Sequence, residues 1–307
     1  MPGGGGEGVW AITAYFNPVG YRRRLSNYRI FRSNLAVPLV TVELSFDGRF
    51  DLTSNDADIL VQISGGALLW QKERLLDIAI KSVPENVENI AWLDCDVIFE
   101  NSNWAGEAEL QLSKLNIIQL YADLVDLGPE GYLPNIKHLP PTGHGIVSAG
   151  ITQQDFATWE EIRSALNGLA WAARRSILEE HGLYDAMIVG GGDTAMFHAA
   201  YGQFEHEMQY HHLYGARQEH YLKWARPYYR TVGEKVGNIP GRIYHLWHGK
   251  FMHRNYLERH RLLAGFNFNP GIDLRIGANG AWQWARPRPD LENYLRKYFS
   301  SRAVDDY

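Results

Sequence analysis

Short, mostly apolar runs alternate along the chain with longer segments whose apolar residues recur at helical spacing. The short runs predict buried strands over residues 9–16, 39–44, 59–63, 90–93 and 243–247. Helical spacing predicts helices over residues 22–35 and 65–82, and Pro84 follows the second of them. This alternation predicts an α/β fold with a Rossmann-like nucleotide-binding core and a mixed sheet.

The second half of the chain predicts a different succession of elements. Residues 159–173 and 174–180 are predicted to be helix-rich, and residues 194–201 are predicted to form a further helix. Three glycines, 190–192, precede Asp193 in a predicted tight loop. Asp193 then takes the N-cap position of the helix that follows.

Composition narrows the class of protein. The chain has 307 residues, of which 45% are hydrophobic and 21% charged, as in an ordinary globular protein. Its formal net charge of -5 provides no basic field for nucleic acid. Cys95 is the only cysteine, which excludes a disulfide framework and leads us to expect a cytoplasmic protein. No apolar run reaches the roughly 20 residues of a membrane span, and the glycine-rich start lacks signal-peptide features.

Two carboxylates, Asp94 and Asp96, interrupt what the apolar residues on both sides predict to be one buried strand. Neighbouring buried carboxylates raise each other's pKa unless a positive charge compensates them. A divalent cation such as Mg²⁺ or Mn²⁺ would do so and would leave positions for phosphate oxygens. The alternative is a strand-end turn with two solvated acids, but the apolar flanks favour metal binding.

Two histidines, His245 and His248, lie in and just after the last predicted strand. A spacing of three residues can direct both imidazoles to one ion, and with Asp96 they would form a mixed nitrogen and oxygen site. Imidazole is a poor ligand for Mg²⁺, so this donor set favours Mn²⁺, with Mg²⁺ as the second possibility.

Asp193 follows three glycines, where the backbone can approach a ligand closely. Its carboxylate is a candidate general base, and the N-cap role needs only an acceptor oxygen, so the two roles are compatible. Tyr15, Asn17 and Arg22 lie around the carboxyl end of the first predicted strand, an edge where α/β sheets bind nucleotides. The alternative for the arginine is the solvated start of a helix.

The order of the motifs resembles a known family. The segment WQKERLL at 70–76 precedes WLDCD at 92–96, GLAWAA at 168–173 precedes GGGD at 190–193, and GRIYHLWH spans 241–248. This series resembles the β-1,4-galactosyltransferase group of inverting GT-A glycosyltransferases and their bacterial and viral relatives. Gly192 departs from the family pattern, because the family has a glutamate at this position.

The resemblance implies a division of roles. It implies that Asp96, His245 and His248 hold Mn²⁺, that Asp94 contacts the nucleotide, and that Asp193 deprotonates the acceptor hydroxyl. The further residues expected to bind the nucleotide-sugar are Trp70, Lys72, Gly191, Gly192 and Lys250. Trp171 is the candidate aromatic platform for an acceptor sugar, with a core role as its alternative.

The expected reaction is therefore sugar transfer from a nucleotide-sugar, with a UDP-sugar favoured, to a carbohydrate or other hydroxyl acceptor. Residues 1–264 are expected to form the GT-A domain, with a nucleotide-binding half at 9–100 and an acceptor and metal half at 101–264. Residues 265–307 would form a C-terminal extension. Three alternatives stay open: a retaining transferase, a nucleotidyltransferase, and an inactive carbohydrate-binding protein. The sequence NPVGYRRR after the first strand is not the glycine-rich, lysine-bearing loop of a nucleotidyltransferase.

Overall fold

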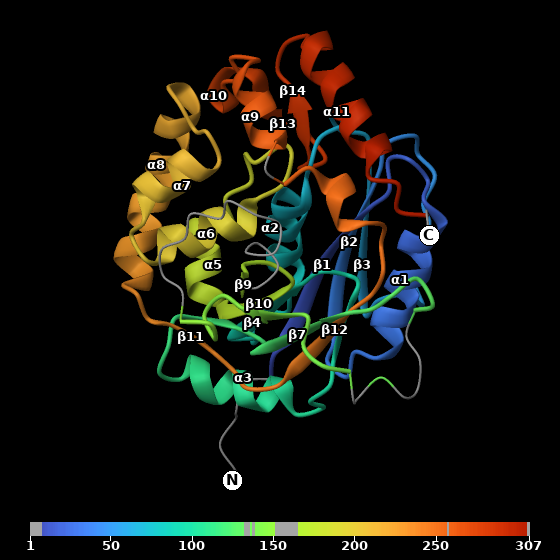
Figure 1. The fold of residues 1–307 in the computed structure, drawn as a ribbon, viewed down its shortest axis with the longest axis vertical. Coiled ribbons are helices and arrows are strands. Elements are labelled where there is room, and N and C mark those ends of the chain that lie inside the picture. Colours follow the sequence, from blue (N-terminus) through green and yellow to red (C-terminus); the bar gives the residue numbers. More distant parts are fainter. Residues whose placement is uncertain (1–7, 132–135, 137–138, 151–164, 257, 306–307) are drawn as a thin grey trace.

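The computed structural model describes residues 8–131, 136, 139–150, 165–256 and 258–305. It confirms the predicted α/β fold with a mixed central sheet (Figure 1). The strand order of this sheet is β11-β6-β10-β4-β1-β2-β3. Its strands are β1 (Trp10–Phe16), β2 (Leu39–Ser45), β3 (Ile59–Ser64), β4 (Asn89–Leu93), β6 (Ile117–Gln119), β10 (Ala170–Arg174) and β11 (Val236–Asn238).

The central sheet is mixed because one strand runs against its neighbours. Strands β1 to β4 are parallel to one another, whereas β10 pairs antiparallel with both β4 and β6. A second, five-stranded sheet has the order β5-β12-β7-β8-β9, and β13 and β14 form a separate pair. These strands are β5 (Val97–Phe99), β7 (Asp123–Asp126), β8 (Gly143–Gly145), β9 (Ala165–Leu166), β12 (Arg242–His245), β13 (Leu274–Ile276) and β14 (Trp282–Trp284).

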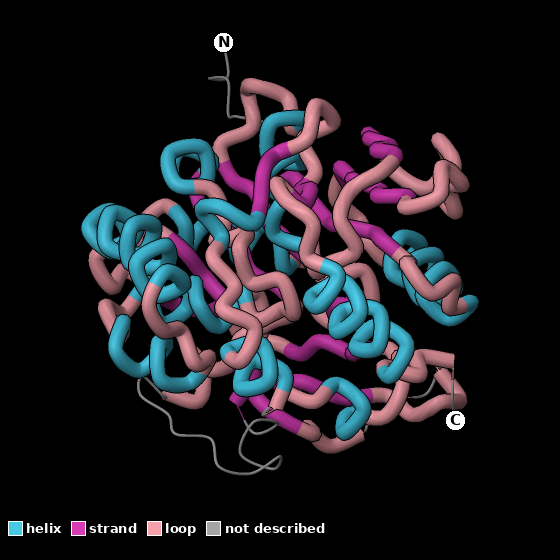
Figure 2. Tube along the Cα trace, turned by 90° about the horizontal axis from the view of Figure 1, so that it is seen from above, coloured by secondary structure: helices cyan, strands magenta, loops and turns pink. Residues whose placement is uncertain are grey.

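Helices cover both faces of the central sheet, as the view in Figure 2 shows. One face packs against α1 (Arg22–Ser33) and α3 (Trp104–Leu112). The other face packs against α2 (Lys72–Ser82), α5 (Arg175–His181), α6 (Gly192–Ala200), α8 (Ala216–Val232) and α11 (Pro289–Ser301). The remaining described helices are α7 (Phe204–Tyr210), the 3₁₀ helix η1 (Phe251–Arg254), α9 (Arg259–Ala264) and α10 (Pro270–Asp273).

Side chains of β1 show why both faces are covered. Ile12, Ala14 and Phe16 point to the face that carries α2, whereas Ala11 and Tyr15 point to the face that carries α1. Successive residues of a strand point to opposite faces, so a strand with apolar residues on both faces must be buried on both.

The chain changes sheets at residues 94–96. We predicted one buried strand interrupted by two acids, but β4 and β5 belong to different sheets. The backbone N–H of Asp94 donates to the carbonyl oxygen of Leu169 (2.8 Å), and the carbonyl oxygen of Asp96 accepts from the N–H of Leu246 (2.8 Å). Each acid is thereby fixed to a different part of the molecule.

The predicted helix at residues 159–173 is wrong where it can be compared. Residues 159–164 lie outside the described residues, and residues 165–174 contain β9 and β10. The alanines of this segment favour a helix locally, but they are packed on both sides between β4 and β6. Burial in the sheet overrides the local preference, because small side chains fit between two layers of helices.

The C-terminal residues pack onto the same core as the N-terminal ones. Leu291, Leu295 and Phe299 of α11 are buried in the cluster that contains β1 and α2. The rings of Phe299 and Phe16 meet edge to face, with their centroids 6.3 Å apart. Within the described part of the chain, no helix has both the length and the apolar character needed to cross a membrane.

We predict that Leu295→Ala destabilises the whole protein by about 2–5 kcal/mol, because it leaves a cavity in the shared core. Urea unfolding followed by tryptophan fluorescence would measure the loss. The control is Lys297→Ala, which removes an exposed side chain of the same helix. An unchanged main transition in Leu295→Ala would show that the C-terminal residues fold apart from the core.

Candidate active site

A cavity of about 590 Å³ opens at the carboxyl ends of β1 and β4. This is the edge at which open α/β sheets place their ligands. Its lining combines carboxylates, histidines and cations with apolar side chains, which is typical of a site for a polar ligand. Lining residues predicted from the sequence are Trp70, Lys72, Asp94, Asp96, Gly191, Asp193, His245, His248 and Lys250.

The turn at residues 94–96 directs its two carboxylates to different partners. Asp94 Oδ1 lies 2.6 Å from Lys72 Nζ. Asp96 Oδ2 accepts a hydrogen bond from His248 Nδ1 (2.6 Å), and Asp96 Oδ1 lies 3.8 Å from His245 Nε2. The turn therefore joins an ion-pair cluster on one side to a histidine cluster on the other.

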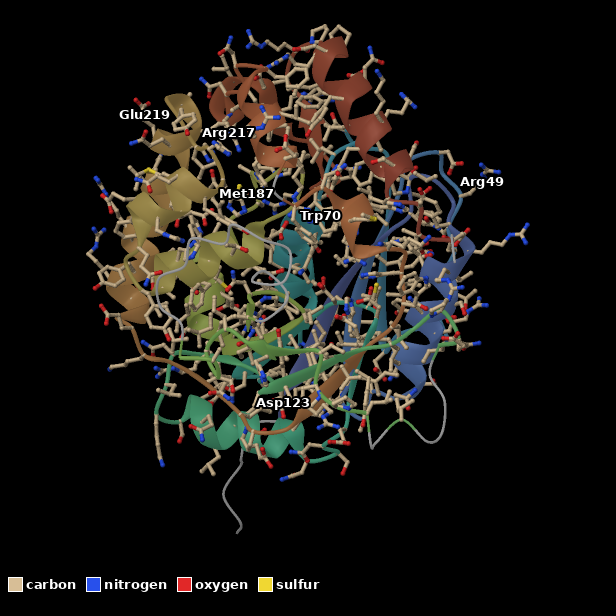
Figure 3. The ribbon with its side chains drawn as sticks, viewed as in Figure 1. Arg49, Trp70, Asp123, Met187, Arg217 and Glu219 are labelled. Carbon is tan, nitrogen blue, oxygen red and sulfur yellow. The ribbon has the colours of Figure 1, made fainter. Side chains whose placement is uncertain are left out.

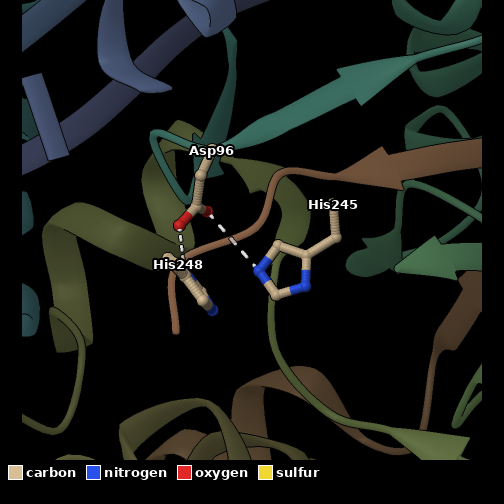
Figure 4. Close-up of side chains that lie close together, drawn as sticks. All are labelled: Asp96, His245 and His248. Carbon is tan, nitrogen blue, oxygen red and sulfur yellow. Dashed lines mark hydrogen bonds and ion pairs between the residues drawn. The ribbon is translucent and has the colours of Figure 1, made fainter. Parts of the chain in front are cut away.

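The second sheet brings Asp96 and the histidines together, as Figure 4 shows. His245 is the last residue of β12 and pairs with Val97, the residue that follows Asp96. Asp126 of β7 lies beside His245 in the same sheet, and its Oδ1 accepts from His245 Nδ1 (2.9 Å). This hydrogen bond assigns the proton to Nδ1 and leaves Nε2 with a lone pair that faces Asp96.

The donor set of this cluster fits a divalent cation. One ligand atom from each of Asp96, His245 and His248 lies within 4.8 Å of the others. Asp96 Oδ1, His245 Nε2 and His248 Nε2 are buried and have no hydrogen-bond partner. Buried polar atoms are rarely left in this state, and a cation between Asp96 Oδ1 and His245 Nε2 would satisfy both. Two imidazoles and a carboxylate suit a transition metal better than Mg²⁺.

The pKa of His245 reflects this crowding of carboxylates. Burial by itself would lower the pKa, but the hydrogen bond to Asp126 and the charge of Asp96 raise it above its ordinary value. The ring therefore lies in a negative environment that attracts a proton or a metal ion.

A second cluster surrounds Lys72, the first residue of α2. Its Nζ lies between Asp94 Oδ1 (2.6 Å) and Asp193 Oδ2 (2.7 Å). Burial alone would lower the pKa of Lys72, but Asp193 and Asp94 together raise it well above its usual value. The ammonium group thus stays charged and offsets the repulsion between the two acids.

Asp193 is placed by the start of α6. We predicted Asp193 as the N-cap, but the N-cap is Gly191, with φ of 108°, and Asp193 lies in the first helical turn. Its side chain accepts a hydrogen bond from Lys72 Nζ. Burial, opposed by Lys72 and assisted by Asp94, raises the pKa of Asp193. A carboxylate with a raised pKa is a stronger base, which is what proton abstraction requires.

Glu73 is a buried acid in this cluster that sequence analysis did not select. Burial raises its pKa to about 8, with Lys72 opposing and Asp193 adding to the rise, so the group is mostly protonated at neutral pH. Its carboxyl group fills the space beside Gly192, where any Cβ would collide with it. Gly192 itself does not line the cavity. The missing side chain at Gly192 thus makes room for an acid from α2.

Three predicted nucleotide contacts lie away from the cavity. The Tyr15 side chain faces α1 and its hydroxyl donates to Asp51 (2.8 Å), because residue 15 has the opposite parity to the cavity-lining residues of β1. Asn17 is bonded to the backbone of Tyr21 in the turn after β1. Arg22 is exposed at the start of α1, the position given above as the alternative to a nucleotide contact. Arg24 lines the cavity instead.

Trp171 also lies outside the cavity lining. It is 1% exposed, stacks on Trp92 with a centroid distance of 6.5 Å, and donates its Nε1–H to the carbonyl oxygen of Asn167 (2.7 Å). A ring buried between the sheet and its covering helices offers no face to an acceptor sugar, so its position matches the core alternative.

We predict that Asp126→Asn weakens binding of Mn²⁺ by about 10–100-fold, because it removes the carboxylate that orients His245. Isothermal titration calorimetry with MnCl₂ would measure the affinity. Asp123→Asn is the matched control, since Asp123 lies on the same strand but bonds to His144 outside the cavity. Equal Mn²⁺ affinity in the two variants would contradict the proposed role of Asp126.

Of the known proteins with which the chain was compared, only solved structures match it. No protein-family model matches the chain, and no curated protein matches it. Drosophila β-1,4-galactosyltransferase 7, a mutant in complex with manganese, UDP-Gal and xylobiose, matches at 10% identity and a TM-score of 0.43, over 94% of this chain and 99% of that one.

Two further matches come from bacteria. TarS of S. aureus in complex with UDP-GlcNAc matches at 12% identity and a TM-score of 0.38. The match covers 63% of this chain and 52% of the TarS chain, so it spans about half the length of TarS. The 4-diphosphocytidyl-2C-methyl-D-erythritol synthase of Anaerococcus prevotii matches at 12% identity and a TM-score of 0.38, over 77% of this chain and 88% of that one.

Proposed function

We propose that this protein is a metal-dependent glycosyltransferase that moves a sugar from a nucleotide-sugar to an acceptor hydroxyl. One observation carries the proposal: three residues that could hold a cation and a half-buried carboxylate with a raised pKa line the same cavity. A transferase of this kind needs both a group that stabilises the leaving diphosphate and a base that activates the acceptor.

Asp96, His245 and His248 would hold Mn²⁺, which supplies the positive charge that stabilises the leaving diphosphate. Lys250 lies exposed at the rim of the cavity and would pair with a phosphate. Asp94 forms an ion pair with Lys72 and is separated from Asp96 by one residue. It would therefore accept hydrogen bonds from the nucleotide or from groups around the metal. A UDP-sugar is the proposed donor.

Asp193 would accept the proton of the acceptor hydroxyl as the oxygen attacks the anomeric carbon. Lys72 is bonded to its Oδ2, so Oδ1 would be the atom that takes the proton. Attack from the face opposite the diphosphate inverts the anomeric configuration. Nuclear magnetic resonance of the product reads this outcome directly, and retention of configuration would remove Asp193 from the role of base in a single displacement.

We expect Mn²⁺ and UDP to bind together and to raise the melting temperature of the protein, because ligands that bind the folded state stabilise it by mass action. At about 100 times the dissociation constant the gain is about 2.7 kcal/mol. A thermal-shift screen of nucleotides and nucleotide-sugars, with and without Mn²⁺, measures it. If no nucleotide stabilises the protein in the presence of metal, the proposed function is wrong.

We predict that Asp193→Asn lowers kcat by about 10²–10⁴-fold, because the amide cannot take the proton of the acceptor. Binding of Mn²⁺ and UDP should stay within about threefold of the unmodified protein, since Asp193 is absent from the cation site. Asp123→Asn serves as the control and should keep full activity. A loss of UDP binding in Asp193→Asn, equal to its loss of activity, would instead assign Asp193 to the donor site.

A further inference from the structure

Four arginines line the cavity in addition to Lys72 and Lys250. Arg24 comes from α1, Arg254 from η1, Arg259 from α9, and Arg302 follows α11. Arg254, Arg259 and Arg302 are only 7–9% exposed. Elements from both ends of the chain thus bring buried guanidinium groups to one cavity.

Within the part of the chain that the structure describes, none of the four pairs with a carboxylate. Their contacts are with aromatic residues. Arg259 Nη1 donates to Tyr298 Oη (3.1 Å), Arg302 lies 4.8 Å from the centre of the Trp70 ring, and Arg24 lies 5.5 Å from that of Phe16. The Nε atoms of Arg24 and Arg259 are buried and have no hydrogen-bond partner.

The arginines also act on one another. Burial lowers the pKa of Arg302, and the positive charges of Arg254 and Arg24 lower it further, while Tyr298 opposes them. Gathering like charges in a poorly solvated cavity is unfavourable unless an anion compensates them. Such an arrangement marks a place where a negatively charged ligand binds.

The four aspartates that line the cavity, Asp94, Asp96, Asp126 and Asp193, already have other partners. Asp94 and Asp193 share Lys72, and Asp96 is bonded to His248. The diphosphate of a nucleotide-sugar carries two negative charges, which a divalent cation would balance. Four guanidinium groups therefore exceed what the diphosphate needs, and their charge calls for a further anion.

The arginines extend from the metal site toward the loop that carries the base. Arg254 lines the cavity together with His245 and His248. At the other end, Arg259 Nη2 and the Trp70 ring both lie 3.5 Å from the position a Cβ would take at Gly190, three residues before Asp193. Trp70 lies at the centre of the molecule in Figure 3. An anion held by Arg259 and Arg302 would thus be close to the reacting hydroxyl.

We propose that Arg24, Arg254, Arg259 and Arg302 form a second anion subsite, which binds a phosphate, sulfate or carboxylate group of the acceptor or of the transferred sugar. The inference rests on the proposed function and adds the substrate class: one of the two sugar-transfer partners is acidic. Guanidinium groups suit this task because they donate paired hydrogen bonds to planar or tetrahedral anions.

Calorimetric titration of sodium sulfate into the full chain, saturated with Mn²⁺ and UDP, tests the subsite, with sodium chloride at equal ionic strength as the blank. We expect sulfate to bind, and Arg259→Gln and Arg302→Gln to weaken it about tenfold or more, since each removes a charged hydrogen-bond donor. Affinity for Mn²⁺ and UDP should change less than about threefold. Arg49→Gln is the matched control, because Arg49 lies exposed at the edge of the molecule in Figure 3.

Two results would overturn the subsite. In one, sulfate fails to bind to either the nucleotide-free or the saturated protein. In the other, Mn²⁺ and UDP displace sulfate, or the glutamine variants lose affinity for UDP and for sulfate to the same extent. Either observation would assign the arginines to binding of the diphosphate. If Mn²⁺ and UDP do not bind at all, the proposed function fails, and sulfate titration of the nucleotide-free protein still tests the arginine cluster.

A comparison of donors separates the two sources of the anion. Tighter binding of UDP-glucuronate than of UDP-glucose, lost in Arg302→Gln, would place the acidic group on the sugar. Equal binding of the two donors, together with arginine-dependent sulfate binding, would place it on the acceptor. Arg259→Lys and Arg302→Lys keep the charge and should bind sulfate with intermediate affinity, and their melting temperatures show whether the fold is intact.

Discussion

The turn at residues 94–96 is the constraint on which the rest of the site depends. It carries the chain from the central sheet into the second sheet, and it sends one carboxylate to each side of the change. Asp94 reaches Lys72 and through it Asp193, whereas Asp96 reaches His245 and His248. Two acids one residue apart can lie at this turn because each meets a different positive or proton-donating partner.

The balance of charge explains most of the cavity. Lys72 compensates the two acids on the side of the proposed base, and the histidines leave a negative pocket that fits a cation. The arginines form a third region, with positive charge that no described carboxylate compensates. A donor on a metal, a base beside it and an acidic reaction partner would complete this arrangement.

Much of the fold could be predicted from the sequence, because apolar runs mark the strands and helical spacing marks α1 and α2. Spacing along the chain also found His245 and His248, whereas Lys72 was found only through the resemblance of the segment at 70–76 to a family motif. Glu73 and Arg302 could not be identified from spacing along the chain, because only the packing of α2 and α11 brings them to the cavity. The alanine-rich strand β10 was missed because burial between two strands overrode helix propensity.

The most direct test of the account is to locate the ion by anomalous X-ray diffraction from crystals grown with Mn²⁺ and UDP. We predict one manganese peak within bonding distance of Asp96, His245 and His248, with the diphosphate bound to the same ion. A peak at another place in the molecule, or nucleotide bound in the cavity without metal at these three residues, would contradict it.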